Sequence, residues 1–119
     1  MTTQEIAARF DELAQTGQWA QIYDELYADD AESIEPGSGS GALQSVKGMD
    51  AIRKKGEEFN AQLEEFHSAY SSPSVVGGNH FSLAMGMEVT MKGAGRIKMD
   101  EICVYKVDGG KIVSEQFFY

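Results

Sequence analysis

A carboxylate stands in an unusual place at the end of the segment YADDAESIEP, residues 27–36. Glu35 follows Ile34, a residue type favoured in strands, and precedes Pro36, which favours extended backbone in the residue before it. A carboxylate on a strand with apolar surroundings can serve as a general base, because burial and nearby charges set its pKa. Glu35 is therefore either a solvated surface acid or a proton acceptor that points into the protein, and these residues alone leave both interpretations open.

Three more side chains have the chemistry to exchange a proton with a ligand, namely His67, Glu101 and Glu115. An unperturbed histidine has a pKa of about 6.5, which suits proton transfer, whereas the alternative for His67 is a packing or capping role. Glu101 and Glu115 lie on segments with strand-like alternation, where the alternative is exposure on the open side of a sheet. Glu115 could also form an ion pair with Lys55 or Arg53.

Charge and cysteine content exclude several classes of partner and site. The chain of 119 residues has ten Lys and Arg and nineteen Asp and Glu, so its net charge is 10 − 19 = −9. Nucleic acids and anionic membranes are therefore poor partners, because binding to phosphate needs cationic side chains. Cys103 is the only cysteine, which excludes an internal disulfide and a multi-cysteine zinc site.

Local motifs for cofactors and targeting are also missing from the sequence. The two histidines and the scattered acids do not have metal-ligand spacing, and GSGSG at 37–41 lacks the Lys-Ser/Thr ending of a phosphate-binding loop. We therefore expect no metal and no cofactor, and interpret GSGSG as a flexible connector. The N-terminus lacks the layout of a signal peptide, and no apolar run approaches the roughly 18 residues of a membrane span, so we expect a cytoplasmic location.

The first half of the chain predicts three helices. Thr2 and Glu5 match a capping box, and apolar residues at helical spacing follow up to Gly17. A second helix starts near Trp19 and closes at Asp29 and Asp30, and the next residues form a short extended piece. The third helix is predicted over about 49–66, with a narrow apolar seam.

The second half changes to a period of two, which predicts strands. Candidate strands cover about 67–76, 80–92, 96–107 and 111–119. Their connections are short, and short turns join antiparallel neighbours. Helices followed by hairpin-linked strands indicate one α+β domain over 1–119, with a curved antiparallel sheet and the helices on one of its faces. Such a layout leaves a hollow between helices and sheet.

The last hairpin permits a prediction of register. If Asp108, Gly109 and Gly110 form a three-residue loop, the numbers of opposed residues sum to 107 + 111 = 218, and directly opposed residues share a face. One face then carries Met99, Glu101, Cys103, Tyr105, Val113, Glu115, Phe117 and Tyr119. The other carries Ile102, Val104, Lys106, Ile112, Ser114, Gln116 and Phe118.

Both of these faces are largely apolar, and one layer of helices covers only one. We expect a second subunit over the face with Ile102 and Phe118, so that Glu101 and Glu115 lie on the inner face, where burial and mutual repulsion raise their pKa values. The middle hairpin leaves two alternatives. A two-residue turn puts Gly86 and Glu88 on the inner face, and a three-residue loop puts Met85 and Met87 there.

Several segments resemble the SnoaL-like group of the nuclear-transport-factor-2-like superfamily, which also holds ketosteroid isomerases, scytalone dehydratase and limonene epoxide hydrolase. They are the opening helix ending at Gly17, YADDAESIEP, GMDAIRKK and the closing DGGKIVSEQFFY. The resemblance covers nearly the whole chain. It implies a cone-shaped, cystatin-like α+β barrel with a mostly apolar pocket, often a homodimer through the outer sheet face.

The resemblance also suggests roles for single residues. ADDAESIEP aligns without gaps to the ADDATVEDP pattern of ketosteroid isomerases, and Glu35 then falls where those enzymes keep the carboxylate that shuttles a proton. The two donors of their oxyanion hole fall at Phe10, which has no hydroxyl, and near Cys103, whose thiol is a weak donor. Tyr119 falls at a position that lines the pocket.

These patterns predict a protein with a small-molecule pocket and three alternatives for its function. The first is a cofactor-independent proton-transfer enzyme of isomerase, cyclase or dehydratase type, with Glu35 as base and His67, Glu101 or Glu115 as acid. The second is a non-catalytic module that binds a small apolar molecule, and the third is a structural dimer with a vestigial pocket. The candidate ligand contacts are Phe10, Trp19, Tyr23, Phe59, Met99, Cys103, Tyr105, Phe117 and Tyr119.

Overall fold

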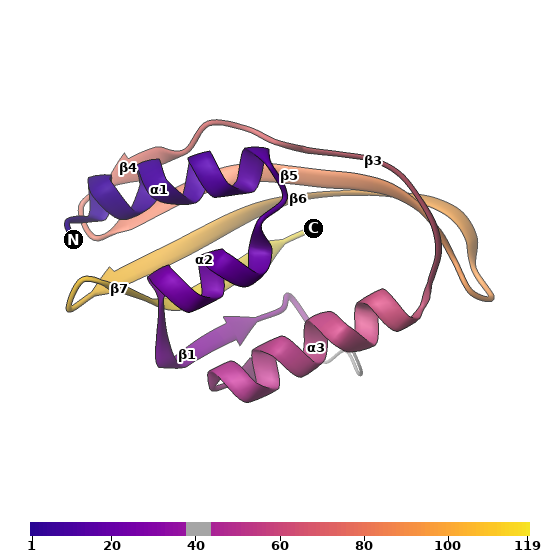
Figure 1. Ribbon diagram of the computed structural model, residues 1–119, viewed down its shortest axis with the longest axis horizontal. Coiled ribbons are helices and arrows are strands. Elements are labelled where there is room, and N and C mark those ends of the chain that lie inside the picture. The colour runs from indigo at the N-terminus through magenta and orange to yellow at the C-terminus, as the bar shows by residue number, and fades with distance from the viewer. Residues whose placement is uncertain (38–43) are drawn as a thin grey trace.

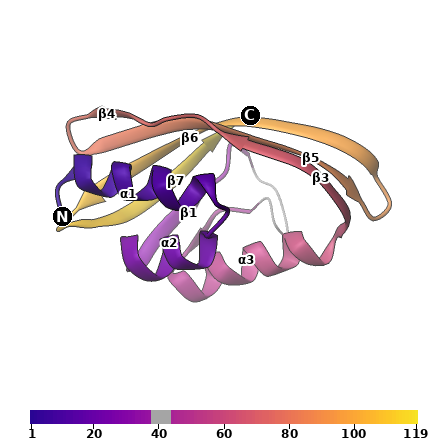
Figure 2. The ribbon, with the colours of Figure 1, turned by 45° about the horizontal axis from the view of Figure 1, so that its top comes forward.

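The computed structural model describes residues 1–37 and 44–119, and in these residues the predicted α+β class is confirmed. Three helices lie on one side of a curved sheet (Figures 1 and 2). The elements are α1 (Thr3–Gln15), α2 (Trp19–Leu26), β1 (Tyr27–Ile34), β2 (Val46–Lys47), α3 (Met49–Ala61), β3 (Leu63–Ser71), β4 (Val75–Gly77), β5 (His80–Met91), β6 (Gly95–Asp108) and β7 (Lys111–Phe118).

Two further observations concern the connector and the length of the helices. The connector predicted at 37–41 lies, apart from Gly37, outside the described residues. Each helix in the described ranges is too short or too polar to cross a bilayer.

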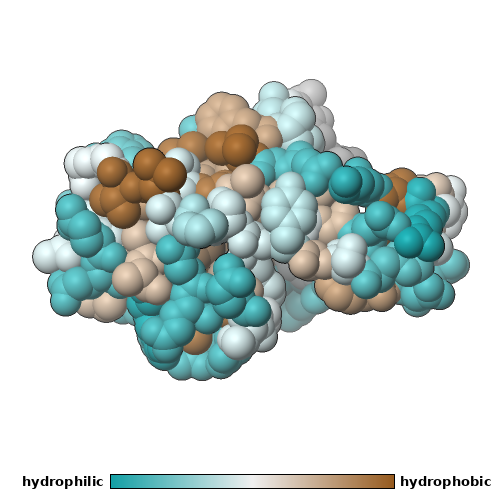
Figure 3. All heavy atoms as spheres, turned by 90° about the horizontal axis from the view of Figure 1, so that it is seen from above, coloured by the Kyte–Doolittle hydropathy of each residue, from teal (hydrophilic) through white to brown (hydrophobic). Residues whose placement is uncertain are grey.

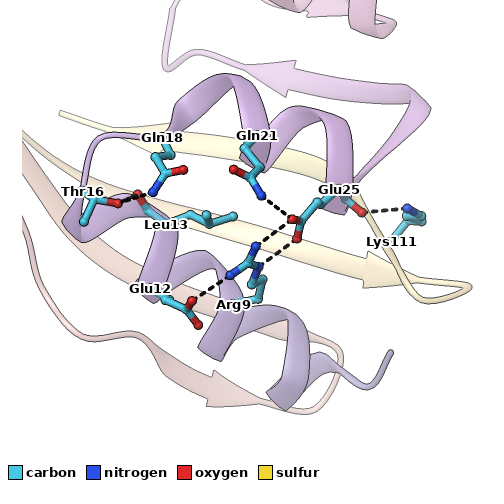
Figure 4. A network of polar contacts seen from close by, with 8 residues as sticks. All are labelled: Arg9, Glu12, Leu13, Thr16, Gln18, Gln21, Glu25 and Lys111. Atoms are coloured by element: carbon cyan, nitrogen blue, oxygen red, sulfur yellow. Dashed lines mark hydrogen bonds and ion pairs between the residues drawn. The ribbon is translucent and has the colours of Figure 1, made fainter.

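The capping box predicted for the first helix is present. Thr2 Oγ1 accepts a hydrogen bond from the Glu5 amide at 3.1 Å, and the Glu5 carboxylate accepts one from the Thr2 amide at 2.8 Å. Arg9 on α1 donates two hydrogen bonds to the Glu25 carboxylate on α2, at 2.8 and 2.7 Å (Figure 4). These bonds lower the pKa of Glu25 to about 2 and fasten the two helices to each other.

The third helix is shorter than predicted. α3 ends at Ala61 rather than at residue 66, and β3 begins at Leu63, which pairs with Met91 of β5. The residues that open β3 include good helix formers such as Leu and Glu. Their intrinsic preference is weak, and pairing with a long neighbouring strand overrides it.

The second helix also ends earlier than predicted. α2 stops at Leu26 and β1 begins at Tyr27, so that Asp29 and Asp30 belong to the strand. Both aspartates are exposed, while Ala31 further along β1 is fully buried. β1 is thus a regular strand of the sheet, between β2 and β7, rather than a short extended piece. Glu35 follows directly after its last residue, Ile34.

The sheet is mixed rather than wholly antiparallel, which corrects the prediction. Its strand order is β2-β1-β7-β6-β5-β3, with β4 beside β5. All neighbours are antiparallel except β1 and β7, which run parallel. The prediction came from short turns, which join only antiparallel strands, whereas β1 reaches β7 after a long intervening stretch of chain. This pairing sets Ser33 directly beside Glu115.

The register predicted for the last hairpin is wrong by two residues. The turn is formed by Gly109 and Gly110 alone, both with positive φ (59° and 78°), as primed two-residue turns require. A bulge then inserts Val113 into β7, so that Tyr105 pairs with Glu115 and the sum becomes 105 + 115 = 220.

The shorter turn and the bulge each shift the register of the last hairpin by one residue, and beyond the bulge the two shifts together restore the predicted faces. Because the total shift is even, Glu115 and Phe117 still share a face with Cys103 and Tyr105. Only between the turn and the bulge do the β7 residues lie on the opposite face from the one predicted. There Ile112, predicted on the outer face, is fully buried, and Val113, predicted on the inner face, forms the bulge.

The middle hairpin has the three-residue loop, which decides between the two alternatives left open by the sequence. Met91 pairs with Gly95 across the loop. As a result Met85 lies opposite Glu101 and Met87 lies opposite Met99, all on the inner face. The inner face next to Glu101 is therefore rich in methionine.

The outer face of the sheet keeps apolar side chains exposed. Ile102 and Phe118 pair directly across β6 and β7 and are 48% and 47% exposed. Val75 on β4 is also exposed, and Figure 3 shows hydrophobic residues among hydrophilic ones toward the end of the molecule where β4 lies.

Candidate functional site

The inner face of the sheet has a closed half and an open half. In the closed half, Phe10 of α1 packs against Phe81 and Tyr105 with ring centroids 5.4 and 4.7 Å apart, and all three side chains are buried. Further along the same face the side chains are only half-buried, and we call this part the open half: Met85, Met87, Met99 and Glu101. The open half is accessible to solvent and has mainly apolar walls.

Glu35 points inward beside this open half. Ala31 and Ser33 are fully buried, and the alternation of the extended chain continues this inner side to Glu35, whose side chain is only 6% exposed. Its Oε1 lies 2.9 Å from Nζ of Lys55, and its Oε2 accepts a hydrogen bond of 2.9 Å from the Tyr119 hydroxyl. Glu35 is therefore a shielded, ion-paired carboxylate.

Lys55 reaches this position from α3. It lies three residues after the buried Ile52, on the same side of the helix, and its side chain is 10% exposed. Besides Glu35, its ammonium group donates to Ser33 Oγ at 2.6 Å and to the Gln44 carbonyl at 3.3 Å. Nζ also lies 5.4 Å from the centre of the Phe117 ring. A lysine held in this way is a fixed positive charge at the edge of the open half.

Glu115 is the most deeply buried acid of the site, at 4% exposure. Ser33 Oγ donates a hydrogen bond of 2.6 Å to its Oε2, and the Tyr27 hydroxyl donates to its Oε1. Burial raises the pKa of Glu115, although the two hydrogen bonds and the nearby Lys55 oppose the shift. We call these six hydrogen-bonded residues the polar cluster: Tyr27, Ser33, Glu35, Lys55, Glu115 and Tyr119.

Glu101 lies beside the polar cluster in the open half. Burial raises the pKa of Glu101, and the negative charges of Glu35 and Glu115 raise it further, against a hydrogen bond from Cys103 and the charge of Lys55. Partial burial and the hydrogen bond to Glu35 likewise raise the pKa of Tyr119 to about 12. The site thus combines an ion-paired carboxylate, Glu35, with a partly buried carboxyl, Glu101, whose pKa is raised.

Three of the four predicted catalytic residues, Glu35, Glu101 and Glu115, are therefore brought together. His67 is not. It is left out of the pairing between β3 and β5 by a bulge, and its ring nitrogens contact Thr90 Oγ1 at 2.8 Å and a Glu65 oxygen at 3.1 Å.

The predicted ligand contacts divide between the two halves of the inner face. Cys103, like Phe10 and Tyr105, is enclosed in the closed half, and Trp19 contacts Phe10 edge to face. Tyr23 packs against Tyr27, and burial raises its pKa. Phe59 is half-buried on α3. Near the open half or the polar cluster lie Met99, Phe117 and Tyr119.

Sequence reasoning missed Ser33 and Tyr27, and it considered Lys55 only as a possible partner of Glu115, whereas Lys55 pairs with Glu35. The spacing of Ser33 and Glu35, two residues apart on an extended segment, was the available signal for one inner side. The place of Lys55 in the seam of α3, between Ile52 and Phe59, was the other. Tyr27 had no such signal, because it was predicted to be helical.

A surface hollow of about 220 Å³ lies next to α3 and includes Lys55 in its wall. Its lining residues are Gln44, Val46, Ala51, Lys54, Lys55 and Glu58. Half of them are charged, so this hollow does not supply apolar walls. The open half, with its methionines, is the better surface for a mostly apolar ligand.

Comparisons with known proteins support one family. The SnoaL-like domain model matches residues 1–119. A solved structure from Mesorhizobium loti, described as a candidate SnoaL-like polyketide cyclase, is 35% identical over 100% of both chains, with a TM-score of 0.92. No curated relative matches the sequence.

Two more distant structures show the fold alone. TerC, co-crystallised with polyporic acid, is 15% identical over 98% of this chain and 90% of its own, with a TM-score of 0.74. A Catenulispora acidiphila protein with a ketosteroid isomerase-like fold, in complex with trimethylamine, is 21% identical over 99% of this chain and 87% of its own, with a TM-score of 0.66.

Proposed function

The chain belongs to the SnoaL-like domain family, and on that premise we propose that it is a cofactor-independent proton-transfer enzyme of isomerase, cyclase or dehydratase type. Its substrate is a small, mostly apolar carbonyl compound that binds over the open half. The observation that carries the proposal is the convergence of Glu35, Glu101 and Glu115 next to this apolar surface. Structures of similar fold that hold small organic molecules, such as polyporic acid, are consistent with it.

In this mechanism Glu35 is the general base. It removes a proton from the carbon next to the substrate carbonyl, and the electron pair of the broken C–H bond forms the enolate. Water is largely kept from Glu35, whose side chain is 6% exposed, so a substrate bound over the open half would meet this carboxylate with few intervening water molecules.

Glu101 is the acid partner in this proposal. Its pKa is raised, chiefly by burial, so that its protonated form persists to higher pH than that of an ordinary carboxyl. A protonated Glu101 can donate a proton to the enolate or to a leaving hydroxyl, and it lies on the same face as Met85 and Met99.

A second function is favoured by one specific observation. Both oxygens of Glu35 are already engaged, one by Lys55 and the other by Tyr119. Two bound donors leave fewer lone pairs of the carboxylate to face a substrate, which suits a module that binds an apolar molecule without converting it.

The proposal includes a homodimer for either function. A second copy of the chain covers the outer face of the sheet around Ile102 and Phe118.

Deuterium exchange tests the enzyme without knowledge of the product. The protein is incubated in D₂O with a panel of small apolar ketones and β-keto esters, and loss of the proton next to the carbonyl is followed by NMR. We expect exchange of at least one compound, slowed about a hundredfold or more by Glu35→Gln. The matched control is Glu32→Gln, an exposed acid on β1, the strand that ends just before Glu35, and it should behave as wild type.

Two other outcomes are informative. Exchange that Glu35→Gln leaves unchanged contradicts the role of Glu35. Thermal stabilisation by a compound that is never exchanged favours the binding module over the enzyme.

A further inference from the structure

The ammonium group of Lys55 has three N–H donors, and each has a partner. Two short contacts, of 2.6 and 2.9 Å, join it to the side chains of Ser33 and Glu35. The third, of 3.3 Å, goes to the Gln44 carbonyl and is the longest. The strongest charge interaction of Lys55 is therefore with Glu35, the residue proposed as base.

Proton abstraction changes this ion pair. When Glu35 accepts a proton from carbon, the C–H electron pair forms a C=C bond and the carbonyl π pair moves to oxygen. Glu35 becomes neutral and the enolate oxygen becomes negative, so the total charge is unchanged. Lys55 loses its charged partner in the same step in which a new anion forms next to it.

We propose that Lys55 is a catalytic residue that pairs with Glu35 before the proton transfer and with the enolate oxygen after it. This inference rests on the proposed function, and it identifies the positively charged group that would stabilise the enolate oxygen in that reaction. An interaction that strengthens as negative charge develops lowers the barrier, whereas one of constant strength only improves binding.

Glu101 is the proposed proton donor and the Tyr119 hydroxyl is bound to Glu35. The other groups near the site carry no positive charge that could pair with the enolate oxygen, or hold that charge elsewhere. Phe10 has no hydrogen-bond donor, and Cys103 offers only a weak thiol, whose pKa burial raises further. The Tyr27 hydroxyl is bound to Glu115. Arg53 points elsewhere, because its guanidinium lies 2.6 Å from the Asp24 carboxylate.

Ser33 and Glu115 act as positioning residues for Lys55. Ser33 Oγ donates to Glu115 and can therefore present its lone pair to the ammonium group. Glu115 is itself fixed by Tyr27 from the other side. A flexible lysine side chain held by this buried chain of hydrogen bonds needs little rearrangement when the charge moves, which is the condition for preorganised electrostatic stabilisation.

A binding experiment tests the role of Lys55 independently of turnover. Glu35→Gln places a neutral amide where the protonated base would be, and 4-nitrophenol serves as the probe because its ionised form resembles an enolate and absorbs visible light. We expect Glu35→Gln to bind 4-nitrophenolate at least about tenfold more tightly than wild type, since the anion replaces the lost carboxylate charge. Glu35→Gln with Lys55→Met should lose this gain.

The controls address charge and folding. Glu35→Gln with Lys98→Met, which removes an exposed lysine on β6, should bind as Glu35→Gln does. Lys55→Arg in the same background keeps the charge and should retain part of the gain. If Lys55→Met does not fold, Lys55→Gln replaces it. Equal affinity with and without Lys55, or no binding to Glu35→Gln, overturns the inference.

Kinetics give a second test once an exchanged compound is found. Lys55→Met should lower the kcat of deuterium exchange by about 10²–10³-fold, as loss of an oxyanion-hole donor does, with a much smaller change in KM. An unchanged kcat overturns the role of Lys55 while leaving Glu35 as base. Absence of exchange by wild type contradicts the proposed function instead, and the probe experiment still decides whether Lys55 receives an anion.

Discussion

The hydroxyl of Tyr119 donates a hydrogen bond of 2.9 Å to Oε2 of Glu35 and thereby joins residues 84 positions apart. Lys55 occupies the other oxygen of the same carboxylate. Glu35 is thus held between a residue that follows the last strand and a residue of α3. The charge state of Glu35 should be visible at both of these neighbours.

Glu35→Gln is expected to change the titration of Tyr119. The pKa of Tyr119 is raised to about 12 by partial burial and by the hydrogen bond and charge of Glu35. Without that charge it should fall toward the unperturbed value of about 10. The measurement is the absorbance of tyrosinate as pH rises, with Glu35→Gln/Tyr119→Phe identifying the signal. Glu32→Gln is the control, and a titration that Glu35→Gln does not alter would show that the two residues are not coupled.

Glu115→Gln is expected to flatten the pH dependence of stability. Burial raises the pKa of Glu115 in the folded protein, so the folded state binds a proton that the unfolded state has already released. Stability from this group is present below the unfolded pKa of about 4.3 and is lost as pH rises from there through the folded pKa.

Urea denaturation of wild type and Glu115→Gln between acidic and neutral pH measures this effect. The free energy of unfolding of wild type should fall relative to the variant by up to about 1.4 kcal/mol per pH unit within the window. A constant difference across the range would mean that Glu115 titrates alike in the folded and unfolded states.

Gly86→Ala is expected to destabilise the protein by about 1–3 kcal/mol. A Cβ at Gly86 would lie 2.4 Å from Tyr70 Cε1, 2.6 Å from an Asp100 oxygen and 2.8 Å from the Met99 carbonyl oxygen. Tyr70 crosses this glycine to donate a hydrogen bond of 2.7 Å to Asp100, so the added methyl group breaks that contact and presses on the backbone.

Gly56→Ala on α3 is the matched control for Gly86→Ala. A Cβ there meets nothing within 4 Å, and alanine is favoured over glycine inside a helix by about 0.5–1 kcal/mol, so this variant should be more stable. Urea midpoints of both variants measure the contrast, and a loss of stability at both positions would point to a cause other than the crowding at Gly86.

Ile102→Glu is expected to give a monomer if a second copy covers the outer face. Ile102 and Phe118 face each other across β6 and β7 and are both about half exposed, so a charge between them would be desolvated in the contact. Sedimentation equilibrium measures the oligomeric state. Ala8→Glu on α1, an exposed position on the helix side of the sheet, tests whether any apolar-to-acid change has this effect, and a wild-type monomer contradicts the expected dimer.

Local sequence signals anticipated much of the fold but not its long-range pairings. The capping box at Thr2 was recognised, and the glycines at 109–110 marked the last turn, although that turn was predicted one residue too long. The parallel pairing of β1 with β7 depends on how distant segments meet, for which a single sequence has no direct signal. The bulge at Val113 was likewise invisible, because its hydrophobic side chain suits an ordinary strand position equally well.

For the candidate site, too, local features could be predicted from the sequence and long-range contacts could not. Glu101 and Glu115 could be placed on an inner face because alternation along a strand is a local property. Glu35 was placed there by its resemblance to the pattern of ketosteroid isomerases. The choice of ion-pair partner could not be predicted, since Lys55 reaches Glu35 only after α3 docks on β1. For Glu115, the sequence suggested a lysine or arginine, whereas a serine and a tyrosine hold it.

The parallel contact between Ser33 and Glu115 has a consequence for the order in which the molecule folds. The hairpins of β5, β6 and β7 close short loops, whereas β1 must wait until most of the chain has been brought back to meet β7, at a greater cost in chain entropy. A kinetic intermediate with the hairpins formed and β1 undocked would already contain most of the sheet. It would lack the polar cluster entirely, so the ability to bind an anion next to Lys55 should arise only in the final step of folding.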